Sequence, residues 1–430
     1  MKVGRLEDFA RAQARVIMGT TWRRTLAMIV LIPVWLLSFL VPRKSSLWVL
    51  GTWEGLSYSD NSRHLHAWLH ANEKDRIRAV WITRRPELAR ELRTLGAEAQ
   101  TPYTLAGIWT CLRASQYIYT HTADDICIWL SGRATRTNLW HGIPLKKINF
   151  DNRFDRYRHA RGFKRLVAWP HRFKRLIESH RVLAPSESVA SLFAGAFRVD
   201  PSRIMIHGYP RNDRLVSPDF PDLLLSKEAT CLERVKNLRR QGSKIVLYMP
   251  TFRRNEQTGQ YREALNAEQL DSDLARLNCH FLIKAHPMST DFSSFSAAVY
   301  QRIIRIPSDL DPYLILPLVD LLVTDYSSIF YDFLVLDRPL IFYPFDMDHY
   351  QKMERELYFD YEAHVPGPIA RSYDELRTLL NSFAANNGDA FVQRRKVLLN
   401  QMFPGYGSVA SPQITASLVS GQTCTEPRHA

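Results

Sequence analysis

The chain has 430 residues, a length that suits two domains of ordinary size. A hydrophobic content of 46% and a charged content of 23% exclude an intrinsically disordered protein. The net charge of +14 indicates an acidic partner, such as nucleic acid, anionic lipid or a phosphate-bearing substrate. The 5 cysteines are odd in number and form no Cys-x-x-Cys pair, which argues against a disulfide framework and a structural zinc site and favours a reducing compartment.

An uncharged apolar run extends from Leu26 to Val41 between pairs of basic residues. It is shorter than the about 20 apolar residues of a membrane-spanning helix, and it contains Pro33. The long segment before it and the lack of a small-residue cleavage site argue against a signal peptide. The basic flanks and an internal tryptophan favour a segment that lies in the headgroup region of an anionic membrane, with a buried N-terminal helix as the alternative.

Short apolar strands then alternate with helical patterns over two long stretches, 47–206 and 232–342. The segment Pro210–Pro221 between them is rich in proline, aspartate and asparagine and is the expected hinge. Strands separated by helices predict parallel sheets covered on both faces. We therefore expect an α/β protein with two Rossmann-like domains and a cleft at the carboxyl ends of the strands. The expected parts are an N-terminal segment 1–45, a first domain 46–215, and a second domain 216–430 with C-terminal helices.

The stretch Asp320–Asp346 combines a short strand, a polar turn, a helix expected from about Ser327 to Leu336, and a second strand. The first N–H groups of a helix lack internal acceptors, and the helix dipole favours negative charge there. The hydroxyls of Thr324, Ser327 and Ser328 gather at this point, so the stretch predicts an anion site. Taken alone, a simple helix cap by Ser327 is the commoner outcome.

Four more polar motifs follow expected strands. One of these strands is Asn138–Trp140. Two motifs contain histidine and the others contain arginine, a combination that fold stability alone does not readily explain. The motifs are WHGIPLK at Trp140–Lys146, GYPRND at Gly208–Asp213, PTFR at Pro250–Arg253 and KAHP at Lys284–Pro287. Because strand ends of such sheets face the same cleft, these motifs favour phosphate binding over simple capping at the Thr324–Ser328 turn.

Together with Ser59–Asn61 and Thr324–Pro344, these motifs resemble the CDP-glycerol glycerophosphotransferase family, the polymerases and primases of teichoic acid and capsule polymers. The resemblance extends from about Trp48 to Tyr350 in the order of the family. It implies a GT-B fold whose first domain faces the acceptor and whose second domain binds the nucleotide. The implied reaction moves glycerol phosphate or ribitol phosphate from a CDP-activated donor to a lipid-linked or polymeric cell-envelope acceptor and releases CMP.

His141 is the expected general base, because imidazole accepts a proton near neutral pH and the resemblance gives this role to the histidine of the HG pair. His286 belongs to the nucleotide half and is expected to contact the diphosphate or assist the leaving group. Arginine forks suit phosphate oxygens, and Asp332 is assigned to a ribose hydroxyl, with a solvated aspartate as the alternative. The residues expected at the donor are Arg211, Thr251, Arg253, Lys284, Thr324, Ser327, Ser328 and Asp332.

No metal and no cofactor besides the donor is expected. Asp346 and Asp348 have the D-x-D spacing of metal-dependent transferases but lie beyond the expected phosphate site. His66 and His70 are four residues apart on an expected helix, without an evident third ligand. Basic side chains and the helix dipole are then the expected source of charge stabilisation.

Two other functions remain open: a GT-B glycosyltransferase that uses a nucleotide sugar, and a basic protein that binds polyanions or membranes without catalysis. The leading interpretation places the protein peripherally on the cytoplasmic face of the cell membrane, against anionic lipid, with no nucleic acid partner. The choice between glycerol and ribitol, the identity of the acceptor and the distinction between primase and polymerase stay open at this stage.

Overall fold

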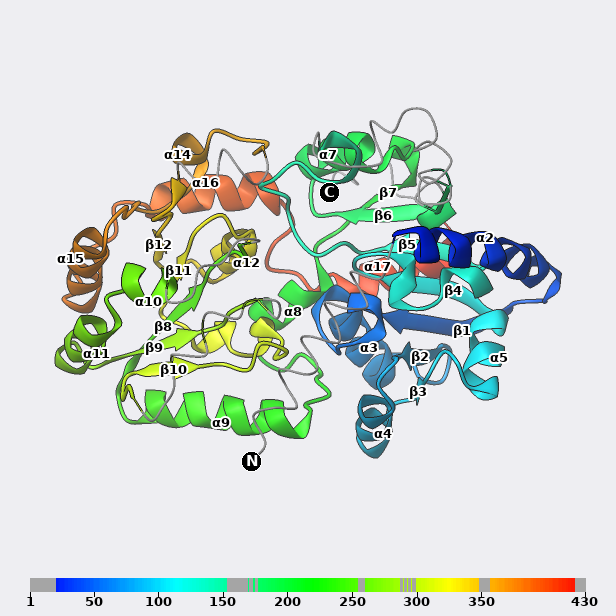
Figure 1. Cartoon of the computed structure of the whole chain (residues 1–430), viewed down its shortest axis with the longest axis horizontal. Helices are drawn as coiled ribbons and strands as arrows, with labels where there is room; N and C mark the ends of the chain where they lie inside the picture. The colour runs from blue at the N-terminus through cyan, green and yellow to red at the C-terminus, as the bar shows by residue number, and fades with distance from the viewer. Residues whose placement is uncertain are drawn as a thin grey trace.

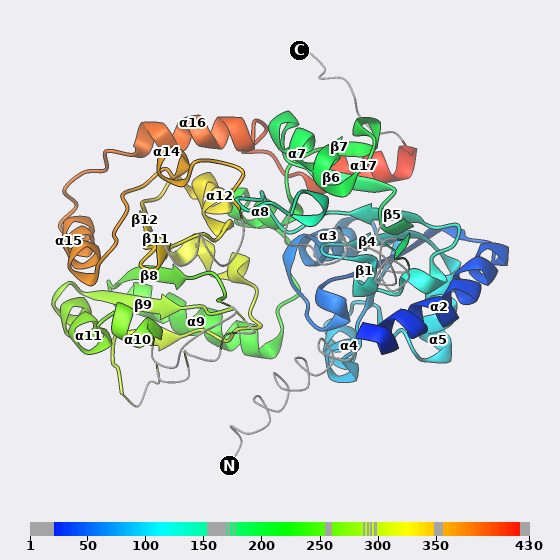
Figure 2. The same cartoon turned by 45° about the horizontal axis from the view of Figure 1, so that its top comes forward.

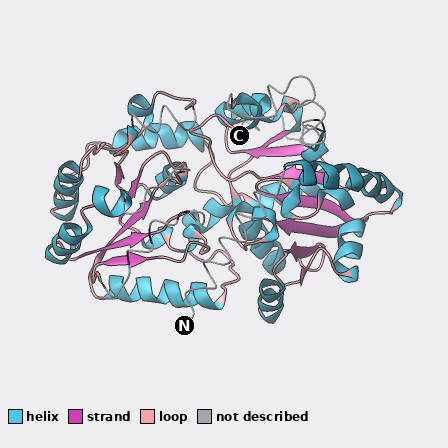
Figure 3. Cartoon of the chain, viewed as in Figure 1, coloured by secondary structure: helices cyan, strands magenta, loops and turns pink. Residues whose placement is uncertain are grey.

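The structure is a computed structural model that describes residues 21–152, 177–253, 260–286, 299–347 and 356–421, with the single positions 169, 173, 174, 289, 292 and 295. Its two parallel sheets form two domains that lie side by side (Figure 1). Helices surround both sheets (Figure 3). This arrangement confirms the predicted α/β class with parallel strands.

The sheet of the first domain has the strand order β3-β2-β1-β4-β5-β6-β7 in the described residues, and every neighbouring pair is parallel. The central strand β1 is apolar and buried from Leu47 to Leu50, where both of its faces are covered, and Val49 and Leu50 are fully buried. The strands are β1 Lys44–Gly51, β2 Arg78–Ile82, β3 Ala99–Gln100, β4 Ala114–Tyr119, β5 Thr135–Asn138, β6 Arg181–Ala184 and β7 Ile204–Ile206. The helices are α3 Asp60–Asn72, α4 Pro86–Thr94, α5 Leu105–Arg113 and α7 Glu187–Phe197.

The sheet of the second domain has the order β10-β9-β8-β11-β12, again with parallel neighbours. Its strands are β8 Lys244–Met249, β9 Cys279–Ile283, β10 Ile303–Arg305, β11 Leu321–Thr324 and β12 Leu340–Phe342. Its helices are α9 Ser226–Arg240, α10 Gln260–Ala264, α11 Ala267–Arg276, α12 Ile329–Phe333, α14 Tyr361–His364, α15 Tyr373–Ala384 and α16 Val392–Met402.

Helix α8 (Pro210–Val216) lies between the domains, where it contacts α3 of the first and the short 3-10 turns Pro312–Leu314 and Leu334–Leu336 of the second. The expected hinge segment therefore begins as a packed helix. The last helix, α17 (Ser411–Ser420), crosses back and lies beside β6 and β7 (Figure 2). The expected second domain 216–430 thus does not contain its final helix, because the buried face of α17 finds its partners on the first domain.

Helix α2 (Thr21–Leu37) lies on the first domain and packs Met28, Leu31, Ile32 and Trp35 against its core. Between Ile29 and Leu37, its other face is exposed to solvent and apolar. No helix in the described part of the chain combines the length and the hydropathy that a membrane crossing requires.

Candidate active site

His141 lies in a tight turn that follows β5. The turn places Trp140 at φ 53° and Gly142 at φ 128°, backbone conformations that a residue with a side chain rarely adopts. The fully buried Asn61 side chain donates hydrogen bonds to the carbonyls of Leu139 (3.2 Å) and Trp140 (2.8 Å). Asn61, from the start of α3, therefore holds the strained turn that carries His141.

The imidazole of His141 has one nitrogen engaged and oriented. Its Nδ1 lies 3.1 Å from the carbonyl oxygen of Thr120, and because a carbonyl only accepts, Nδ1 carries the proton. Nε2 is then the nitrogen that can accept a proton. Burial, with His121 beside it, lowers the pKa of His141 to about 3, so the ring is neutral near pH 7. Neutral imidazole with an available nitrogen is the form that a general base needs.

His286 reaches the same region from the second domain, where it follows β9. Its ring centroid lies 5.8 Å from that of Trp53 in the first domain and 5.4 Å from that of Phe252. Burial, followed by the charges of Lys284 and Lys146, lowers the pKa of His286 to about 4. Trp53 also contacts His121, whose ring is stacked on that of His141. The two histidines predicted from the sequence therefore belong to one region where the domains meet.

Arg211 and Asp332, both predicted at the donor, are paired with each other. The buried guanidinium of Arg211 donates from Nη2 to Asp332 Oδ2 (2.7 Å) and from Nη1 to Asp60 Oδ1 (2.9 Å). Asp60 lies in the first domain and Asp332 in the second, so Arg211 joins the domains. Its contact with phosphate and that of Asp332 with ribose stay predictions.

Gly142 shows where the motifs meet. A Cβ atom at this glycine would lie 2.6 Å from Arg211 Nη2 and 3.4 Å from Ser328 Oγ. The turn of His141 therefore packs directly on the arginine of the GYPRND motif and on the hydroxyl of the TDYSS motif. A side chain at position 142 would separate them.

The strand ends of β8 and β11 bring the other donor candidates together. Arg253 is buried and pairs with Asp325 (2.7 Å) and Asp346 (2.8 Å). The amide of Thr251 donates to Asp325 (2.8 Å), while the buried Thr251 hydroxyl has no hydrogen-bond partner among the described residues. Thr324 donates to the Met249 carbonyl (2.7 Å).

Lys284 lies at the end of β9. Its Nζ donates to the Ser308 carbonyl (3.2 Å), and burial lowers its pKa to about 8. The amine therefore keeps a substantial positive charge at neutral pH, as a phosphate ligand requires. Pro287, the last residue of this motif, lies outside the described residues.

Helix α12 begins at Ile329, two positions later than predicted, and after Phe333 it continues only as a 3-10 turn. Ser328 occupies the N-cap position without a side-chain capping bond, and Ser327 and Ser328 are both half-buried. A short helix has a weaker dipole than the predicted one, so the hydroxyls and nearby basic side chains carry the prediction of an anion site.

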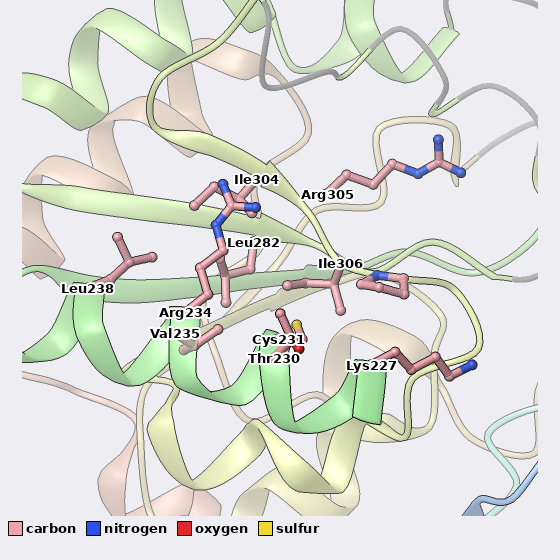
Figure 4. A pocket seen from close by; sticks show the side chains of 11 residues that line it. Lys227, Thr230, Cys231, Arg234, Val235, Leu238, Leu282, Ile304, Arg305 and Ile306 are labelled. Carbon is pink, nitrogen blue, oxygen red and sulfur yellow. The ribbon is translucent and has the colours of Figure 1, made fainter. Parts of the chain in front are cut away.

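Groups of three or more histidine, cysteine, aspartate or glutamate residues that could hold a metal ion do not occur in the described part of the chain. Asp346 pairs with Arg253, and Asp348 lies outside that part. A separate cavity of about 230 Å³ lies between α9 and the strands β9 and β10 (Figure 4). None of the candidate site residues lines it.

Residues 35–411 match a family model described as CDP-Glycerol:Poly(glycerophosphate) glycerophosphotransferase. The chain belongs to this family. It is similar to the teichoic acid glycerol-phosphate transferase of Staphylococcus aureus, with 29% identity over 404 residues that cover 88% of this chain and 94% of that protein. The teichoic acid poly(glycerol phosphate) polymerase of Bacillus spizizenii is 27% identical over 355 residues, which cover 78% of this chain and 83% of that protein.

The fold is similar to that of the wall teichoic acid polymerase TagF, with a TM-score of 0.67 and 20% identity over 98% of each chain. This likeness confirms the predicted GT-B-like α/β fold. The family match confirms the predicted enzyme class, a transferase that moves polyol phosphate from a CDP-activated donor. The roles of individual site residues stay predictions.

In this glycerophosphotransferase family member, the structure adds two residues to the region around His141 that sequence reasoning missed, His121 and Trp53. The ring of His121 is stacked on that of His141, and the ring of Trp53 contacts His121 with centroids 4.3 Å apart. Neither belongs to a motif that the sequence analysis singled out. The available signal was position, because Trp53 closely follows β1 and His121 closely follows β4 along the chain.

Proposed function

We propose that this enzyme transfers glycerol phosphate from CDP-glycerol to a hydroxyl of a phosphate-rich, lipid-linked or polymeric acceptor. The choice of glycerol rests on coverage. Relatives named for glycerol phosphate match between 75% and 88% of the chain, whereas those named for ribitol phosphate match between 43% and 46%. The acceptor class fits the net charge of +14, since a phosphate polymer is a polyanion.

The geometry of His141 carries the mechanism. Its Nε2 removes the proton of the acceptor hydroxyl, and the oxygen forms a bond to the phosphorus that bears the glycerol. The bond from this phosphorus to the CMP oxygen breaks, and CMP leaves with the electron pair. Nδ1 stays bonded to the Thr120 carbonyl throughout, which keeps Nε2 aimed at the acceptor.

The second domain holds the donor in this proposal. The Thr251 hydroxyl, which has no partner among the described residues, and the half-buried Ser327 and Ser328 hydroxyls are suited to phosphate oxygens. Lys284 supplies positive charge, and His286 faces the leaving group from the nucleotide half. Basic side chains thus offset the charge that develops on the phosphate, with no additional cofactor in the proposed step.

A product assay tests the reaction. The protein is incubated with an envelope lipid extract and one of CDP-glycerol, CDP-ribitol or UDP-sugars, and nucleotide release and product mass are measured. We expect CMP release from CDP-glycerol, with product masses increased by glycerol phosphate units. Faster turnover of CDP-ribitol would overturn the choice of glycerol. UDP release from a UDP-sugar without CMP release from either CDP-polyol would establish the glycosyltransferase alternative.

We also propose that the enzyme works as a peripheral protein on the anionic, cytoplasmic membrane face. The support is the apolar surface that α2 and the turn after it present to solvent, where Val30 and Leu37 are each 62% exposed and Leu40 is 76% exposed. A helix buried on one side and apolar on the other suits a position within the lipid headgroups. Deletion of the helix would also remove its contacts to the core, so substitutions are the cleaner test.

Replacing Val30 and Leu37 together with aspartate is expected to weaken binding to anionic phospholipid vesicles at least about tenfold, because charges oppose insertion into lipid. Vesicle co-sedimentation measures the effect. The matched control replaces Val397 of α16 and Val419 of α17 with aspartate. These valines are 58% and 53% exposed. Equal vesicle binding by the two double variants would show that α2 does not dock the protein.

A further inference from the structure

His121 follows β4 and lies flat on the proposed base. The ring centroids of His121 and His141 are 4.1 Å apart, with 9° between the ring planes. Trp53 also contacts His121, with ring centroids 4.3 Å apart and 47° between the ring planes. The His121 side chain is only 20% exposed, so the two rings hold it in place.

A buried carboxylate fixes this stack. Asp125 is fully buried and accepts backbone N–H bonds from Glu54 (2.9 Å), Thr120 (3.2 Å) and His121 (2.9 Å). It therefore ties the turn after β1 to the turn after β4. The adjacent residues Thr120 and His121 both contact His141. The Thr120 carbonyl orients Nδ1 of His141, and the His121 ring covers the face of its imidazole.

The surroundings keep the covering ring neutral. Burial, with the charges of His286 and Arg211 next, lowers the pKa of His121 to about 3. Asp125 Oδ2 stands 4.0 Å from His121 Nδ1, and Thr120 Oγ1 is 3.1 Å from the same nitrogen. Among the described residues, three titratable groups act on the charge of His141: His121, whose own positive charge would lower the pKa of His141, Asp60, which raises it, and Arg211, which lowers it. A neutral aromatic face attracts a cation lying against it, whereas a second positive charge repels it.

We propose that His121 is a positioning residue of the transfer reaction. Its neutral ring stabilises the positive charge that His141 gains when it takes the acceptor proton, and it keeps Nε2 of His141 turned to the cleft. His121 itself exchanges no proton and forms no bond to the substrate. The inference rests on the proposed function, in which His141 is the general base.

Three substitutions separate charge stabilisation from packing. His121→Phe keeps an aromatic face, His121→Leu fills the space without one, and His121→Ala leaves the space open. We expect the Leu and Ala variants to lower kcat about 5- to 30-fold, the range that a desolvated cation–aromatic contact corresponds to, with donor and acceptor KM within about twofold. The Phe variant is expected to stay within about threefold of the unchanged enzyme.

His364→Leu is the matched control, because His364 is stacked on Phe359 with centroids 4.1 Å apart and ring planes at 3°. Among the described contacts of His364, none involves the ring of Trp53, His121 or His141. The kcat of the His364→Leu variant is therefore expected to be unchanged. Thermal unfolding of each variant verifies the fold. Equal kcat for His121→Leu and His121→Phe would overturn the inference, since packing alone would then explain the contact.

His141→Gln separates this inference from the proposed function. If His141→Gln is active, His141 is not the general base, and both the proposed mechanism and the role of His121 are overturned. An inactive His141→Gln variant alongside His121 variants that match the unchanged enzyme would overturn the role of His121 alone.

Discussion

Replacing His141 with glutamine is expected to lower kcat about 10²- to 10⁴-fold, the contribution of a positioned general base, with the fold preserved. Glutamine retains a donor for the Thr120 carbonyl but cannot take the proton of an acceptor hydroxyl near neutral pH. The rate of CMP release from CDP-glycerol measures the loss, and circular dichroism during thermal unfolding monitors the fold.

His207→Gln serves as the control for this experiment. His207 Nε2 lies 2.9 Å from the Ser417 hydroxyl on α17, outside the candidate site, and burial likewise lowers its pKa. Its kcat is expected to be unchanged. Turnover at the normal rate in His141→Gln would show that another group, or water, removes the acceptor proton.

Replacing Arg211 with methionine is expected to destabilise the protein by about 3–5 kcal/mol, because it leaves the buried carboxylate of Asp332 without its partner. Asp332 is almost fully buried, and Asp60 is the second carboxylate on the same guanidinium. Burial raises the pKa of Asp332, so in the variant the folded state takes up a proton at a higher pH than the unfolded chain. The stability deficit should therefore shrink as the pH falls from 8 to 5. Urea unfolding at both pH values measures it.

Two further variants test the bridge. Adding Asp332→Asn to Arg211→Met removes one stranded charge and is expected to recover part of the lost stability. Arg78→Met breaks the exposed pair with Glu98 and is expected to cost no more than about 1 kcal/mol. If Arg211→Met keeps its stability but raises the KM for CDP-glycerol, the guanidinium serves the donor, as the motif alone predicted.

The sequence predicted the two parallel sheets well because strands buried on both faces contain continuous apolar runs, such as Leu47–Leu50 in β1 and Ile245–Met249 in β8. It misplaced β5, expected at Asn138–Trp140 and found at Thr135–Asn138. The residues of β5 are threonine, arginine and asparagine, and they form a strand because β4 and β6 bond to them on both sides. The two-residue edge strand β3 carries no pattern long enough to detect.

The candidate site divides in the same way. His141, His286 and the hydroxyl turn were predictable because their residue types at strand ends indicate chemistry. The pairing of Arg211 was not, because Asp60 and Asp332 lie 151 and 121 positions away along the chain. The stacking of His121 on His141 was likewise not predictable. His121 follows β4 and His141 follows β5, and these two strands become neighbours only in the folded sheet.

The return of α17 to the first domain gives the molecule a defined mechanical axis. The chain enters the second domain after α8 and leaves it again between α16 and α17. The two crossings meet, because Asp213 of α8 accepts hydrogen bonds from the amides of Ala410 (2.7 Å) and Ser411 (2.9 Å). Because the two connections between the domains are bonded to each other at one place, they restrict twisting and sliding of one domain against the other. Rotation of the domains about that place is the motion that they restrict least. We therefore expect the domains to open and close around a donor by rotation about α8, a motion that would change the distance between His141 of the first domain and Ser328 of the second.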